Sequence, residues 1–112
     1  MGVDVALIRV EQQGSSPRRR CASQVDVVVD LHDRFARVCE SSSLPMLSRV
    51  EPYGTLILTS SEMDQFIAEV EFEVEFSRVE DPVVKELLKA VFRLARECHE
   101  REAMQLRLRA VS

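Results

Sequence analysis

The side chains best suited to catalysis or metal binding are two histidines and three cysteines. His99 with Glu102, or Asp30 with His32, could supply part of a metal site, and Cys98 would add a soft ligand. A zinc site needs three or four converging ligands, however, and the chain has neither CxxC nor HxxxH spacing. Such isolated pairs are usually solvent-facing or core residues. We therefore expect no metal and no cofactor.

Nucleophilic catalysis needs a base within hydrogen-bond reach of the nucleophile. Cys98 and His99 are neighbours on an expected helix and point about 100° apart, so His99 cannot act as the base for the Cys98 thiol. A Cys39–His99 or Cys98–His32 pair across the fold stays open. The three glycines cannot build a phosphate loop. The residues favour a non-catalytic protein; the alternative is a small enzyme or ligand-binding domain using His32, Cys39, Cys98 or His99.

Acidic side chains concentrate in one segment. Residues 61–81 carry eight acids against Arg78 alone, whereas residues 1–56 carry seven acids and seven bases. Such a segment repels nucleic acids and anionic membranes and attracts basic surfaces. A solvated face is the usual role of a charge run, and a docking surface for a basic protein partner is the sharper interpretation. We place that surface at Glu69, Glu71, Glu73 and Glu75.

One basic cluster, Arg18-Arg19-Arg20, follows the loop-forming residues 13–17. On a hairpin tip such a cluster is usually a solvated loop, and binding of phosphate or an acidic partner is the alternative. The chain has one tyrosine and no tryptophan, so it lacks the aromatic residues of a base-stacking platform. We expect no nucleic-acid binding.

Two strands and a helix are expected in the first third of the chain. Val3 to Val10 is apolar on both faces at its centre, which predicts a central strand. Residues 25–29 predict a second strand that returns beside the first as a long-looped hairpin. Asp30 can then cap a short helix, whose apolar residues have helical spacing: Leu31, Phe35, Val38 and Cys39.

The middle of the chain is rich in local signals. Pro52 and Gly54 occupy favoured positions of a tight turn, around which residues 46–50 are predicted to pair with a strand at 55–59. Ser61 followed by Asp64 predicts a capping box at the start of the next helix.

That helix should run to at least Val70. Residues 69–76 alternate Glu with Val or Phe, which is typical of a half-buried strand, yet Val70 and Val74 also continue the helical stripe of Met63, Phe66 and Ile67. Residues 71–76 therefore stay undecided between helix and strand.

The last helix has the strongest pattern. Asp81 is expected at its N-cap and Pro82 at its first position, ahead of an apolar stripe from Val84 to Cys98. Alternation at residues 106–110 predicts a closing strand. The expected fold is α+β: a single domain over residues 1–112, with a four- or five-stranded, mostly antiparallel sheet and about three helices packed on it.

Composition bounds the setting. Of the 112 residues, 46% are hydrophobic and 30% charged, which is typical of a globular protein. No apolar run approaches the roughly twenty residues of a membrane span. An odd number of cysteines without CxxC spacing is typical of reduced thiols. We expect a cytoplasmic protein that does not bind membranes, and a homodimer stays open.

Two motifs in residues 44–110 carry a resemblance: Pro52-Tyr53-Gly54 with Met63 and Glu69, and the Leu87–Cys98 helix before a final strand. They resemble a group of small, uncharacterised cytoplasmic proteins of high-GC Gram-positive bacteria. The resemblance implies no activity.

From charge, size and the missing catalytic set, our first functional hypothesis is a module that docks on a basic partner, as immunity proteins and antitoxins do to nuclease toxins.

Overall fold

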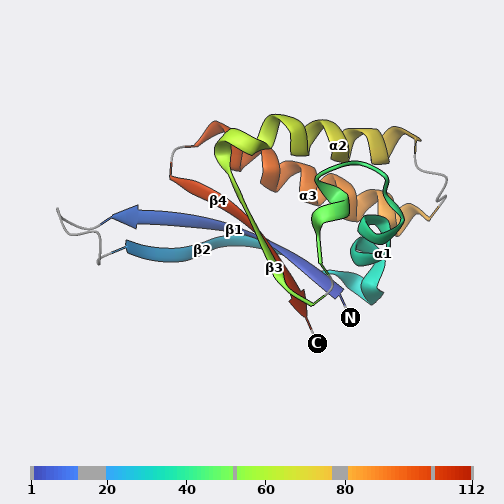
Figure 1. The fold of residues 1–112 in the computed structure, drawn as a ribbon, viewed down its shortest axis with the longest axis horizontal. Helices are drawn as coiled ribbons and strands as arrows, with labels where there is room; N and C mark the ends of the chain where they lie inside the picture. The colour runs from blue at the N-terminus through green and yellow to red at the C-terminus, as the bar shows by residue number, and fades with distance from the viewer. Residues whose placement is uncertain (1, 13–19, 52, 77–80, 102, 112) are drawn as a thin grey trace.

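A computed structural model describes residues 2–12, 20–51, 53–76, 81–101 and 103–111. It contains one antiparallel sheet of four strands in the order β2-β1-β4-β3, with helices α1, α2 and α3 on one side of it (Figure 1). This confirms the predicted α+β class. The strands are β1 (Gly2–Gln12), β2 (Arg20–Val28), β3 (Thr55–Thr59) and β4 (Met104–Val111), and the helices are α1 (Arg34–Ser41), α2 (Met63–Phe76) and α3 (Pro82–Glu100).

The first strand is central, as its apolar sequence predicts. On β1, Val5 lies opposite Val28 of β2 on one side and Leu108 of β4 on the other. The hairpin of β1 and β2 is confirmed, although β2 begins at Arg20, five residues before the predicted start at Val25. The cluster predicted at the hairpin tip falls outside the described residues, except for the backbone of Arg20.

The core lies between the sheet and the helices. Alternate residues of β1 and β4 face the helices and are almost fully buried. They pack with the apolar stripe of α3 and with Phe35 of α1 and Phe66 of α2. Buried residues of the two strands and of α3 include Val3, Val5, Leu7, Leu106, Leu108, Leu88, Val91 and Ala95. In the described residues, no helix is long and apolar enough to cross a membrane.

The first helix begins later than predicted. Leu31–Asp33 forms a separate turn in which His32 and Asp33 have φ values of 56° and 59°. Asp33 stands at the N-cap position but makes no capping side-chain hydrogen bond. Asp30 supplies the capping carboxylate, which accepts hydrogen bonds from the backbone N–H groups of Phe35 at 2.8 Å and Ala36 at 3.0 Å. It also accepts from Val3 N at 2.9 Å, which ties α1 to the start of β1.

The predicted pairing of residues 46–50 with 55–59 is wrong. Leu47–Arg49 forms a 3₁₀ turn, and β3 pairs with β4. The reason lies on α2: the carboxylate of Glu69 takes the backbone N–H groups of Met46 and Leu47, which a strand would need for its ladder.

The helix after β3 is capped two residues earlier than predicted. Thr59 N donates to Glu62 Oε1 at 3.0 Å, so Thr59 and Glu62 form the capping pair expected at Ser61 and Asp64. The undecided residues 71–76 are helical. Helix α3 confirms its predicted start, because Asp81 Oδ1 accepts from Val83 N at 2.9 Å and Pro82 stands at the first helical position.

Candidate functional site

Of the four acids predicted to bind a partner, Glu69 is a buried structural residue. Only 6% of the surface of Glu69 is exposed, so the residue is buried at the edge of the core. Its carboxylate accepts from Met46 N and Leu47 N, both at 2.9 Å, and from Gln65 Nε2 at 2.9 Å. A buried carboxylate is stable only when donors replace its lost hydration, and these groups do so. Its assignment to an exposed docking surface is therefore wrong.

Glu73 belongs to the same side of α2. It is half-buried, and its Oε1 accepts from Ser42 Oγ at 3.0 Å. Gln65, Glu69 and Glu73 are spaced four residues apart, so they form one row along the helix. We call this row the inner flank of α2. It fastens the segment of residues 42–47 to the helix.

The exposed acids form a different row. Asp64, Glu71 and Glu75 are exposed and occur at i, i+7 and i+11, which places them on one line about 16 Å long. We call this row the outer stripe of α2. Residues 61–76 contain no lysine or arginine. Asp64 was not among the predicted partner-binding residues; its place on the stripe depends on residues 71–76 being helical.

One aromatic side chain accompanies the outer stripe. Phe72 of α2 is 49% exposed. Its helical position lies about 100° from Glu71 and about 60° from Glu75, so it borders the stripe. The surface thus has an apolar group beside its carboxylates.

The buried thiols are unsuited to catalysis. Burial raises the pKa of Cys39 far above its ordinary value, and the carboxylates of Asp30, Glu73 and Glu40 raise it further. Burial also raises the pKa of Cys98 to about 11. Both are therefore thiols at neutral pH, whereas the thiolate is the nucleophile and the metal ligand.

The two histidines lie at opposite ends of α3. His99 Nε2 is 3.4 Å from Asp64 Oδ1, near the C-terminal end of the helix. His32 lines a cleft with Asp81, at the N-terminal end. Eighteen helical steps separate Asp81 from His99, or about 27 Å. Cys98 is therefore remote from His32. Among the described residues, no group of three or more His, Cys, Asp and Glu side chains could hold a metal ion.

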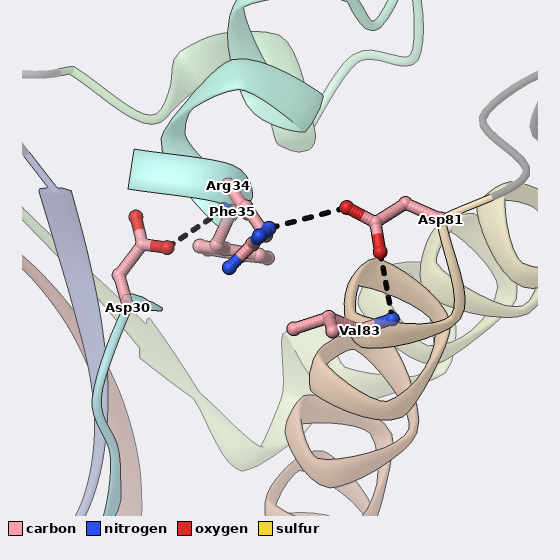
Figure 2. A network of polar contacts seen from close by, with 5 residues as sticks. All are labelled: Asp30, Arg34, Phe35, Asp81 and Val83. Atoms are coloured by element: carbon pink, nitrogen blue, oxygen red, sulfur yellow. Dashed lines mark hydrogen bonds and ion pairs between the residues drawn. The ribbon is translucent and has the colours of Figure 1, made fainter. Parts of the chain in front are cut away.

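The cleft that includes His32 was not anticipated from the sequence. It has a volume of about 420 Å³ and lies between α1 and the start of α3. Arg34 Nε donates to Asp81 Oδ2 at 3.2 Å across it, and the same Asp81 caps α3 (Figure 2). The described residues that line it are His32, Arg34, Arg37, Val38, Ser41, Asp81 and Val84. The sequence signal for this cleft was the pair Arg34 and Arg37, three residues apart on one helix. Asp81, which lines the same cleft, is far from them in the sequence and comes near them only in the folded protein.

No family model, curated protein sequence or solved structure matches this chain.

Proposed function

We propose that this protein is a small, non-catalytic protein-binding module of the cytoplasm that docks on a basic partner, as an immunity protein or antitoxin does. The observation that carries the proposal is the outer stripe of α2. Its three carboxylates lie in one line on an exposed helix face. Among the described residues, no lysine or arginine forms an ion pair with Glu71 or Glu75.

Exposed like charges in a row favour encounter with an opposite charge. They attract a basic surface over roughly the Debye length, about 8 Å at physiological ionic strength, and so raise the association rate. Charges at the rim of an interface contribute mainly to this rate and to specificity, while aromatic side chains contribute more to the bound state. Phe72, half-exposed beside the stripe, supplies such an aromatic group.

The stripe also has little structural use. Glu69 and Glu73 are occupied by hydrogen bonds that hold residues 42–47. Within the described part of the chain, the outer stripe has one intramolecular polar contact, the 3.4 Å approach of Asp64 to His99. Its carboxylates are thus available to a partner without loss of the fold.

The test compares two variants with equal change of charge. One is Asp64→Lys/Glu71→Lys/Glu75→Lys on the outer stripe. The matched control is Glu86→Lys/Glu97→Lys/Glu100→Lys, which reverses three exposed acids of α3. Each immobilised protein is exposed to extract from its own cell type at low salt and then washed with rising salt.

The proposal expects one basic protein to be retained by wild type and by the α3 variant, and to elute as salt rises. With that partner purified, the α2 variant should associate with it at least about tenfold more slowly than wild type does. Equal slowing of association in the two variants would show that net charge, and not the stripe, governs binding. Binding unaffected by either variant would reject the acidic docking surface.

A further inference from the structure

The cleft between α1 and α3 combines an apolar floor with a cationic rim. Val38 and Val84 are buried at its base. His32 and Arg37 are exposed at its edge, and Arg34 is half-buried. Its volume of about 420 Å³ is within the range of small-molecule pockets. The cleft therefore has room for a small organic ligand.

Both arginines retain donors for a ligand. Arg34 uses Nε for Asp81, and within the described residues its terminal nitrogens make no further hydrogen bond. The guanidinium of Arg37 forms no ion pair with any described carboxylate. Being three residues apart on α1, the two side chains share one helix face. Guanidinium groups in this arrangement suit the oxygens of a phosphate or carboxylate.

The charge balance of the lining favours an anion. Among the described lining residues, two guanidinium groups face one carboxylate, that of Asp81, which is already engaged by Arg34 and by the backbone of Val83. Asp81 also fixes the guanidinium of Arg34 over the start of α3, as Figure 2 shows. Held in this way, Arg34 is oriented before any ligand arrives, which reduces the entropy lost on binding.

The backbone before α1 is unusual at this cleft. His32 and Asp33 are consecutive non-glycine residues with positive φ. Two such residues in a row are strained, and surrounding contacts must enforce them; strain of this kind concentrates at functional sites. Here Asp30 enforces it by holding the first N–H groups of α1. The result is that His32 lies at the rim beside the two arginines.

From these observations we propose that the cleft binds a small organic anion, a phosphate or carboxylate on an apolar body, with Arg34, Arg37 and His32 holding the charged group and Val38 and Val84 contacting the body. This ligand site is separate from the outer stripe of α2. It does not depend on the proposed function, and its test involves different residues.

Phenyl phosphate and benzoate are suitable probes, with benzyl alcohol and inorganic phosphate as controls. Titration is followed by the backbone amide signals of the protein. Both anionic probes, or one of them, should shift the signals of α1 and of Val83 and Val84, and the stronger probe identifies the head group. Benzyl alcohol lacks the charge and inorganic phosphate lacks the apolar body, so each should bind at least about tenfold more weakly.

Variants make the proposal falsifiable. Arg34→Gln/Arg37→Gln should weaken binding at least about tenfold, whereas Arg93→Gln/Arg96→Gln on the exposed face of α3 should leave it unchanged. Arg37→Gln alone covers the case in which losing the Arg34–Asp81 pair disturbs the fold, because Arg37 forms no ion pair with a described residue. The proposal is overturned if neither anion shifts the cleft signals, if benzyl alcohol shifts them equally, or if the α3 variant loses binding as the α1 variant does.

Discussion

The glutamates of the inner flank and of the outer stripe alternate along residues 69–75 of α2, yet the surroundings of the two pairs differ completely. Glu69 and Glu73 accept hydrogen bonds from the segment of residues 42–47, whereas Glu71 and Glu75 face solvent. Two helical residues span about 200°, so a repeat of two places successive glutamates on opposite sides of the helix. The role of each carboxylate follows from the hydrogen-bond donors within its reach, backbone N–H groups for Glu69 and the Ser42 hydroxyl for Glu73, and these cannot be read from the residue type.

The largest effect that would sharpen this contrast is expected at Glu69. Glu69→Ala leaves two buried N–H groups and the Gln65 amide without their acceptor, and should lower the free energy of unfolding by about 3 kcal/mol. Glu71→Ala, two residues away, should change it by less than about 0.5 kcal/mol. Denaturant unfolding of both variants measures the difference, and equal losses would contradict the division of α2 into two sides.

Asp30, between β2 and the turn at Leu31–Asp33, is a second carboxylate that accepts hydrogen bonds from several backbone N–H groups. Its oxygens accept from the N–H groups of Val3, Phe35 and Ala36, but the residue is only half-buried. Asp30→Ala should therefore cost about 2 kcal/mol, less than Glu69→Ala because water can replace part of what is lost. Asp26→Ala, an exposed acid of β2, is the matched control. Thermal or denaturant unfolding decides whether the loss exceeds that of the control.

The burial of Cys98 should also make the free energy of unfolding depend on pH. Cys98 titrates near 9 when unfolded, and burial raises its pKa in the folded protein to about 11. As the pH rises, the Cys98 thiol therefore loses its proton in the unfolded state before it does so in the folded state. The stability that the neutral thiol contributes is fully present below pH 9 and is lost as pH rises toward 11. The decline should be steeper in wild type than in Cys98→Ala, and parallel profiles would refute the assignment.

The smallest expected effect concerns the outer stripe itself. Asp64→Lys/Glu71→Lys/Glu75→Lys should change the free energy of unfolding by less than about 1 kcal/mol, because its side chains are exposed and their interactions are screened. Circular dichroism and denaturant unfolding would measure it. A loss as large as that of Glu69→Ala would mean that the stripe stabilises the fold, leaving less reason to assign it to a partner.

Local sequence signals predicted the elements that depend on local physics. The apolar centre of β1 and the Asp81-Pro82 start of α3 with its long stripe predict their structures correctly. The signals failed where a distant residue decides. Met46 and Leu47 pair with Glu69, more than twenty residues away, and this contact displaces the expected hairpin.

The candidate sites follow the same rule. The acidic character of α2 was visible in the sequence, but separating its two sides required knowing that residues 71–76 are helical. In this helix Val70 and Val74 lie on the core side, and Phe72 is left half-exposed. The cleft was missed because Arg34 and Asp81 are 47 residues apart and no periodicity connects them.

The strand order has a consequence for how the protein emerges from the ribosome. The first and last strands, β1 and β4, pair with each other in the middle of the sheet, with Val3 opposite Ala110. During synthesis β1 and β2 can form a hairpin early, but β1 then has an unpaired side until residues 104–111 leave the exit tunnel. Helices α1 to α3 have by then been made and have no complete sheet to cover. A nascent chain in which β1 waits for β4 keeps one side of β1 exposed to unwanted strand pairing until β4 is made, so slow decoding just before residues 104–111 or loss of a holdase chaperone should reduce its soluble yield.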